Sequence, residues 1–239
     1  MNDCKENIKV PNEIVSLYEE YNDIKVPYFR SRKSLQLRKR VFKGKGSFTE
    51  IQNEISKLQK NNQSNESIQL LLVKNNIGID CSGFISHLYN AYTMVKYKKP
   101  IWNFFSRPST NPFQLLLFKI QPIVSKLNAA TLTSDLNTKT IQKVKDIRPL
   151  DLIKFSGGRH VGLIYQIFQN GGKVERIDYI HATEGTGITK NTIRIIDEEK
   201  NIFAQEWEGK TKGAKYEPEY LMRYTINKNG IRRPNFLIS

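Results

Sequence analysis

Three side chains that could act together in acyl transfer stand out in this sequence: one cysteine and two histidines. Cys81 lies in the run Gly78-Ile79-Asp80-Cys81-Ser82-Gly83-Phe84, where a turn passes into an amphipathic helix. His160 and His181 stand at the ends of two predicted neighbouring strands. A thiol, a histidine that takes up its proton and a second polar group that orients this histidine are the components of cysteine-dependent acyl transfer.

The position of Cys81 favours reactivity. Asp80 is a suitable N-cap, and Phe84, Leu88 and Tyr92 recur every four residues, so the thiol is expected in the first turn of a helix. Unpaired backbone N–H groups and the helix dipole favour negative charge there, which predicts a lowered thiol pKa. The alternative is that Cys81 is a small apolar residue that packs the start of the helix.

The two histidines belong to one predicted hairpin, which turns at Asn170-Gly171-Gly172. Antiparallel pairing would bring His160 and His181 to the same end of the sheet. His87, on the helix of Cys81, is expected to be structural or to lie on the surface. Zinc binding by Cys81 with both strand histidines is an alternative, although no short paired ligand spacing supports it.

The order of the predicted elements is helices first and an antiparallel sheet second, which is the α+β class. Asn12 and the pair Thr49 and Gln52 are expected to cap the first two helices. Helices are predicted over 13–26, 50–59, 66–74 and 81–92. Strands are predicted up to 155 and over 160–168, 174–181 and 188–196, with a last strand from 220–226 together with 236–238.

Three blocks of the sequence, in this order, resemble the NlpC-type family of bacterial cell-wall cysteine peptidases. They are 80–84 (DCSGF), 149–155 (PLDLIKF) followed by 160–165 (HVGLIY), and 180–183 (IHAT). The resemblance implies a papain-like fold (clan CA), with the nucleophile at a helix N-terminus packed on an antiparallel sheet. It also implies that Cys81 is the nucleophile, that His160 is the general base and acid, and that His181 orients His160.

Tyr28 and Ser82 are expected to contact the substrate, Tyr28 because Val26-Pro27-Tyr28-Phe29 resembles the segment that lines the active site in that family. The chain also departs from the family pattern. The glycine pair after the tyrosine is missing, Leu150 stands where the family has glycine, and an aromatic insert lengthens the separation of Cys81 and His160.

Composition describes a folded, soluble chain with a strong positive charge. Of 239 residues, 38% are hydrophobic and 26% charged, and the net charge of +15 favours anionic partners. The two cysteines, Cys4 and Cys81, form no disulfide framework. No signal-peptide or membrane-spanning run is present, which predicts a cytoplasmic protein unless it is exported by another route.

We expect a helical and basic N-terminal extension over 1–76 and a peptidase domain over 77–239, with an aromatic and proline-containing insert at about 95–143. The aromatic part of the insert is expected to be core. Half of the residues in 30–45 are Lys or Arg, which predicts a solvated basic face or a contact with a polyanion.

The expected function is that of a cysteine peptidase or amidase without cofactor or metal. By resemblance, it is an endopeptidase for peptidoglycan stem peptides or muropeptides, acting between γ-D-glutamyl and a diamino acid. Thioester transacylation would use the same side chains. The alternative function is that of a silent or repurposed peptidase-like module that binds nucleic acid or another polyanion through 30–45.

Overall fold

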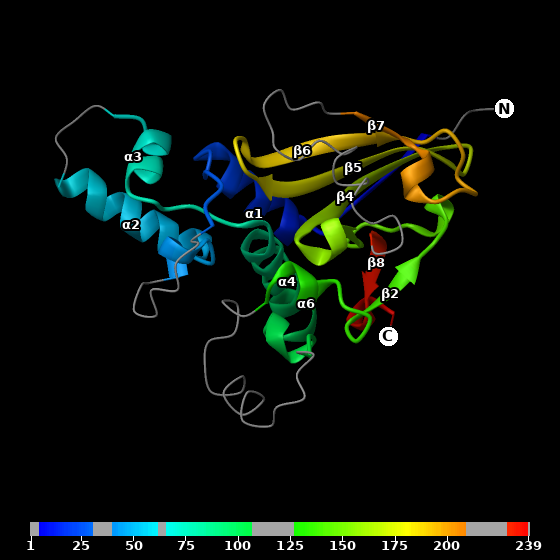
Figure 1. Ribbon diagram of the computed structural model, residues 1–239, viewed down its shortest axis with the longest axis horizontal. Coiled ribbons are helices and arrows are strands. Elements are labelled where there is room, and N and C mark those ends of the chain that lie inside the picture. The colour runs from blue at the N-terminus through cyan, green and yellow to red at the C-terminus, as the bar shows by residue number, and fades with distance from the viewer. Residues whose placement is uncertain (1–4, 31–39, 62–65, 107–126, 209–228, 239) are drawn as a thin grey trace.

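The protein folds as an antiparallel sheet with helices packed mainly against one face (Figure 1). The structure is a computed structural model that describes residues 5–30, 40–61, 66–106, 127–208 and 229–238. The helices are α1 (Asn12–Asp23), α2 (Phe48–Asn61), α3 (Ile68–Lys74), α4 (Cys81–Tyr97) and α6 (Ala129–Leu132). The strands are β1 (Lys5–Lys9), β2 (Thr138–Ile141), β3 (Leu152–Phe155), β4 (His160–Asn170), β5 (Lys173–Thr183), β6 (Gly187–Arg194), β7 (Glu206–Glu208) and β8 (Gly230–Pro234). The α+β class is confirmed.

The described strands form one sheet in the order β2-β8-β3-β4-β5-β6-β7, with every neighbouring pair antiparallel. β4 and β5 are its longest strands, and the predicted two-residue turn joins them. Gly171 and Gly172 both have positive φ, at 56° and 80°, which is the backbone that such hairpin turns require. The histidine-bearing hairpin predicted from the sequence is therefore present.

The first residues of the chain join this sheet. β1 pairs with the second half of β4, from Lys5 opposite Asn170 to Lys9 opposite Gln166, while β3 pairs with the first half. The sequence analysis predicted no strand before residue 10. The segment at 1–76 thus contributes a strand to the sheet of the proposed peptidase domain, besides its helices.

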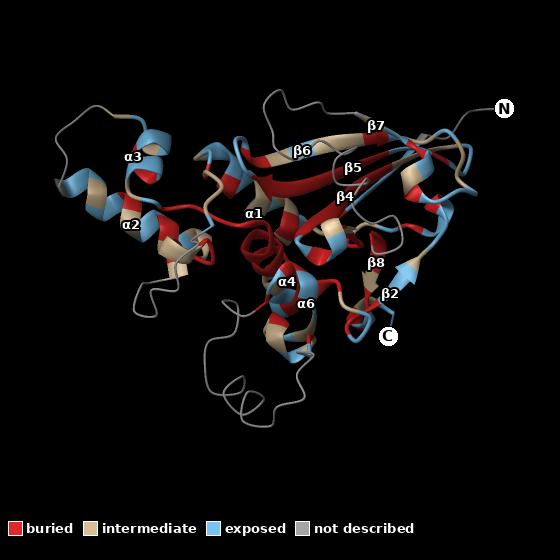
Figure 2. Ribbon diagram, viewed as in Figure 1, coloured by how far each residue is buried: buried red, intermediate tan, exposed pale blue. Residues whose placement is uncertain are grey.

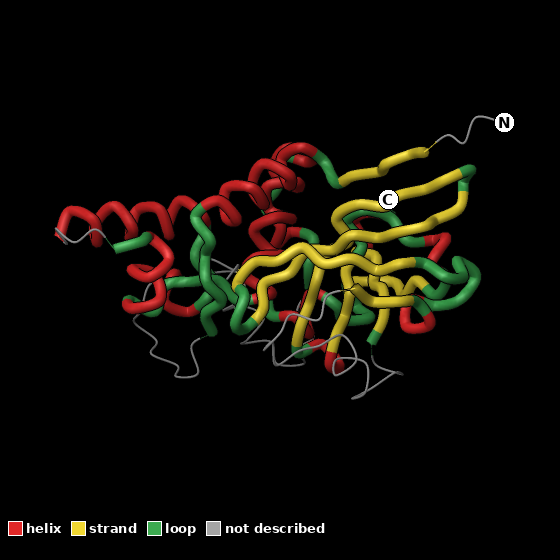
Figure 3. Tube along the Cα trace, turned by 90° about the horizontal axis from the view of Figure 1, so that it is seen from above, coloured by secondary structure: helices red, strands yellow, loops and turns green. Residues whose placement is uncertain are grey.

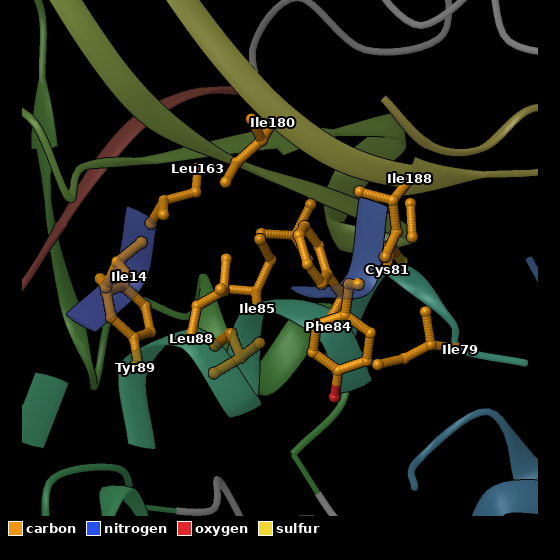
Figure 4. Close-up of a cluster of buried hydrophobic side chains, with 14 of the residues drawn as sticks. Ile14, Ile79, Cys81, Phe84, Ile85, Leu88, Tyr89, Leu163, Ile180 and Ile188 are labelled. Carbon is orange, nitrogen blue, oxygen red and sulfur yellow. The ribbon is translucent and has the colours of Figure 1, made fainter. Parts of the chain in front are cut away.

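Helix α4 lies in the main core, where it packs against α1 and against β4 and β5, and the start of the helix is buried (Figure 2). The ring of Tyr21 from α1 meets Phe84 edge to face, with 5.6 Å between centroids. Figure 4 shows Cys81 in the same apolar cluster as Phe84 and Ile180. The core therefore surrounds the start of α4, and not only its apolar stripe.

Helices α2 and α3 project from the end of the molecule away from β2 and β8 (Figure 3). The predicted cap of α2 was wrong by two residues: Ser47 and Glu50 form the capping box, with bonds of 2.7 and 3.2 Å between backbone N–H and side-chain oxygen. The predicted cap of α1 was also wrong, because Pro11 holds the N-cap position and makes no side-chain bond.

The C-terminal strand also differs from the prediction. β8 spans Gly230–Pro234, whereas Asn235–Leu237 is a short 3-10 helix; residues 220–226 lie outside the described residues. Phe236 explains the difference, since its ring packs into the aromatic cluster of the insert, 5.2 Å from Phe104 and 5.8 Å from Phe105. This part of the insert is core, as expected, while 107–126 lies outside the described residues.

A buried ion pair joins β8 to the start of β3. Asp151 is fully buried and accepts two hydrogen bonds of 2.8 Å from Arg233.

Within the described ranges, no helix has both the length and the apolar character needed to cross a membrane.

Candidate active site

Cys81 is the first residue of α4, and Asp80 is its N-cap, as predicted. The Asp80 carboxylate accepts a bond of 2.6 Å from the backbone N–H of Gly83. The thiol lies near the start of β4, where the backbone N–H of Val161 acts to lower its pKa. Val161 follows His160, and Arg159, which precedes His160, lines the same pocket as Cys81, so the residues on both sides of His160 lie near the thiol.

The electrostatics of the thiol differ from the prediction. Burial raises the pKa of Cys81 to about 11, and the negative charge of Asp80 adds to this effect. Lys45 and the backbone N–H groups of Val161 and Ser82 act in the opposite direction but do not outweigh burial. The expectation of a lowered pKa was wrong because it counted the helix terminus and left out the loss of water around a side chain that is 5% exposed.

The two strand histidines contact each other directly. Nε2 of His160 lies 2.7 Å from Nδ1 of His181, a hydrogen-bonding distance, and both rings are buried. The register of β4 and β5 produces this contact, since Leu163 lies opposite Ile180 and the histidines are therefore diagonal neighbours on one face. Since His160 uses Nε2 toward His181, a proton exchanged between His160 and the thiol or a substrate would have to pass through Nδ1.

Aromatic rings enclose this pair. Phe155 lies 5.4 Å from the His160 ring, and Tyr179 lies 5.3 Å from the His181 ring, measured between centroids. Burial lowers the pKa of His160 to about 4, with the charge of Asp80 opposing it, and lowers the pKa of His181 well below 6.5. Both rings are therefore neutral at pH 7, and the resting site combines a thiol with neutral imidazoles.

Asn191 on β6 is a further neighbour of the histidine pair, because it contacts His181. It was not singled out from the sequence. Its side-chain Nδ2 lies 3.1 Å from Nε2 of His181 and 3.3 Å from the hydroxyl of Tyr179. The register places Asn191 opposite Tyr179, diagonal to His181. Only the pairing of β5 with β6 reveals this neighbour, because ten residues and a turn separate the two side chains in sequence.

Lys45 is the second residue that the sequence analysis missed. It was counted in the basic stretch 30–45, yet it is only 7% exposed. Its ammonium group donates to Asp80 Oδ1 at 2.9 Å, to Ser82 Oγ at 2.5 Å and to the Leu127 carbonyl at 3.2 Å. A buried cation with three acceptors therefore lies beside the thiol, and it compensates the charge of the N-cap.

Two glycines allow Lys45 to reach this position. Gly44 has φ +73°, and an added Cβ would lie 2.2 Å from the carbonyl oxygen of Phe29. A Cβ on Gly83 would lie 2.3 Å from the carbonyl oxygen of Gly44. Gly44 and Gly83, on either side of this contact, were the available sequence signal for the close approach.

The predicted substrate-contacting residues both line a pocket of about 260 Å³ that contains Cys81. Tyr28 reaches it through a bridge to Ile79, parallel in direction. Ser82 also lines it, but its hydroxyl is engaged, since it donates to Asp80 at 3.0 Å and accepts from Lys45. Ser82 therefore organises the polar cluster at the start of α4, whatever it contributes to a substrate.

His87 has a structural role, as expected. It is buried, and its Nε2 lies 3.1 Å from the Lys45 carbonyl oxygen, to which it can donate.

The zinc alternative would need Cys81, His160 and His181 as joint ligands. In the part of the chain that the structure describes, no three His, Cys, Asp or Glu side chains are grouped so that they could hold a metal ion.

No family model, curated protein or solved structure matches this chain. The resemblance to cell-wall cysteine peptidases therefore depends on the three short sequence blocks, and the site has to be interpreted from its own geometry.

Proposed function

We propose that this chain is a cysteine-dependent amide hydrolase of the papain-like class, with Cys81, His160 and His181 as its catalytic residues. One observation supports this most: the thiol at the start of α4 lies near Val161, the residue after His160, and Nε2 of His160 lies 2.7 Å from Nδ1 of His181. Acyl transfer requires a nucleophile, a base and an orienting group, and Cys81, His160 and His181 are proposed for these roles in this order.

In the proposed reaction, the sulfur of Cys81 attacks an amide carbonyl while its proton passes to Nδ1 of His160. Concerted transfer suits a resting pair in which both groups are neutral. The backbone N–H of Cys81 would stabilise the oxyanion. His160 then returns the proton to the leaving amine as the C–N bond breaks, and a thioester remains. Water activated by His160 cleaves the thioester and restores the thiol.

His181 can support this cycle only in one tautomer. A base at Nδ1 of His160 requires its proton to be on Nε2, donated to Nδ1 of His181. His181 then carries its own proton on Nε2 and needs an acceptor, which the side-chain oxygen of Asn191 supplies if its amide is turned over. Asn191 would thus be a positioning residue that selects the reactive tautomer.

By resemblance, the substrate proposed is a peptidoglycan stem peptide or muropeptide. The test is incubation of the purified protein with soluble muropeptides, followed by mass spectrometry of products and of an alkylated Cys81. We expect one new amine and one new carboxylate per cleavage, absent with Cys81→Ala. Intact peptides at stoichiometric enzyme would contradict hydrolysis of this substrate.

The polyanion-binding alternative receives less support from the described part of 30–45. Lys45 is buried against Asp80, and Arg40 pairs with Glu50 at 2.8 Å, so both are engaged within the protein. Residues 31–39, which hold four of the basic residues in this stretch, lie outside the described residues.

A further inference from the structure

Besides Lys45 and the start of α4, three separated parts of the chain line the pocket beside Cys81. Tyr28 and Arg30 come from the segment after α1, Asn128 to Ala130 from the start of α6, and Gly158 and Arg159 from the turn before β4. Its volume of about 260 Å³ is enough for a small substituent of a substrate, not for a polymer. Whatever occupies it lies next to the thiol.

The charge of this pocket is one-sided. Its lining holds three cationic side chains, Arg30, Lys45 and Arg159, and one carboxylate, Asp80. Lys45 and Asp80 neutralise each other at 2.9 Å. Among the described residues, neither arginine has an acidic partner, and both are exposed to solvent. Two guanidinium groups therefore supply excess positive charge at the mouth of a pocket that contains the nucleophile.

We propose that Arg30 and Arg159 form a subsite for a carboxylate carried by the substrate beside its scissile carbonyl. Guanidinium groups present planar pairs of N–H donors that match the two oxygens of a carboxylate. Arg159 directly precedes His160, and Arg30 is two residues after Tyr28, so a carboxylate held between them would fix an acyl group beside Cys81. This inference rests on the proposed function and narrows its substrates to acidic amides.

The test compares two alkylating reagents of the same size, iodoacetate, which carries a carboxylate, and neutral iodoacetamide. Each displaces iodide by the sulfur of Cys81, so no turnover is needed. Alkylation of Cys81 proceeds at pH 8 and is followed by mass spectrometry. The measured quantity is the ratio of the rate constants for iodoacetate and iodoacetamide. Any attraction that the histidines exert on iodoacetate is common to all variants, so differences between variants isolate the arginines.

We expect Arg30→Gln and Arg159→Gln each to lower the iodoacetate-to-iodoacetamide ratio by about two- to fivefold, as for exposed charge pairs, and the double variant to lower it further. Arg194→Gln is the matched control: it removes an equal charge from β6, where Arg194 pairs with Glu206, and should leave the ratio unchanged. An unchanged ratio in both pocket variants, or an equal fall in the control, would overturn the subsite.

This outcome is separate from that of the proposed function. A ratio that depends on both arginines together with uncleaved muropeptides would retain the carboxylate subsite and reject the peptidoglycan substrate. Cleavage with a ratio independent of the arginines would retain the hydrolase and reject the subsite. All variants should show the same iodoacetamide rate as the parent, which confirms that the surroundings of the thiol are intact.

Discussion

Lys45 and Asp80 form a buried ion pair, with 2.9 Å between Nζ and Oδ1, at the N-terminus of the helix that begins with Cys81. The pair joins two segments that are 35 residues apart in sequence. Its carboxylate also caps the helix, so one side chain both holds the helix start and sets the charge beside the thiol.

Replacing Lys45 with Met should strongly destabilise the protein. The variant keeps most of the side-chain volume but leaves the Asp80 carboxylate buried without its partner. Such a loss costs about 3–5 kcal/mol of unfolding free energy. Urea denaturation of the variant and the parent measures it.

The double variant Lys45→Met with Asp80→Asn is the informative control, since Asn is also a good N-cap and needs no counterion. It should recover much of the lost stability. Lys57→Met, which breaks the exposed pair with Glu54, should change stability by less than about 1 kcal/mol. If the Lys45→Met variant is as stable as the parent, the buried pair does not stabilise the protein.

The reactivity of Cys81 should keep rising with pH. With a thiol pKa of about 11, the thiolate fraction grows close to tenfold for each pH unit below that value. The iodoacetamide rate at Cys81 should therefore increase steadily from pH 6 to pH 9. A rate that is already constant above pH 6 would mean that a thiolate–imidazolium pair exists in the resting enzyme.

The protein should lose stability in mild acid. His87 and His160 have pKa values near 4 when folded, because burial disfavours their charged form. A folded pKa below the unfolded value of about 6.5 means that the unfolded chain binds more protons between these limits, so stability falls as pH drops from 6.5 toward 4, by about 3 kcal/mol per histidine.

His87→Gln isolates one of these contributions, since glutamine can still donate to the Lys45 carbonyl but does not titrate. Between pH 7.5 and 4.5, urea denaturation should show that the stability of the variant falls less steeply than that of the parent, because unfolding of the variant takes up nearly one proton less. The same pH dependence as the parent would show that His87 is charged in the fold or that it does not titrate in this range.

Substitutions of His181 should follow its proposed orienting role. An Asn or Gln side chain can still accept a hydrogen bond from Nε2 of His160, so His181→Asn and His181→Gln should retain more cleavage than His181→Ala. Cys81→Ala and His160→Ala should abolish turnover, and combining Cys81→Ala with a His181 change should add nothing. An Ala variant with full activity would remove His181 from the site.

Asn191 should act through its oxygen. Asn191→Asp keeps an acceptor for Nε2 of His181 and adds a negative charge, which raises the pKa of both neighbouring histidines and should move the acidic limb of the kcat profile to higher pH. Asn191→Leu removes the acceptor and should lower kcat by about tenfold or more. Equal kcat and pH profiles for both variants would mean that Asn191 only packs.

The sequence predicted the elements that carry the candidate catalytic residues, because local signals determine them. Asp80 before an apolar stripe predicts the helix start at Cys81, and Asn170-Gly171-Gly172 predicts the hairpin that joins His160 to His181. The strand at 5–9 escaped prediction because its partner is 160 residues away. Its one apolar residue, Ile8, is exposed, so the strand carries no buried apolar pattern.

The electrostatics could not be predicted for a related reason. The expected thiol pKa considered the helix that contains Cys81. In the fold, burial raises this pKa, and Val161 of β4 and Lys45, which are both distant in sequence, oppose the rise. Leu150 is a second position at which distant contacts decide the local structure. It stands where the resembled family has glycine, and it adopts φ +76° while remaining buried, so its apolar contacts offset the backbone strain.

The pairing of β1 with β4 also determines when the protein can finish folding during synthesis. Residues 5–9 leave the ribosome long before their partners at 166–170 are made. The thiol at 81 likewise waits for the strands that carry both histidines. Until these strands have been made, a nascent chain exposes to chaperones the faces of α1 and α4 that later pack against the sheet, and the candidate site is not assembled.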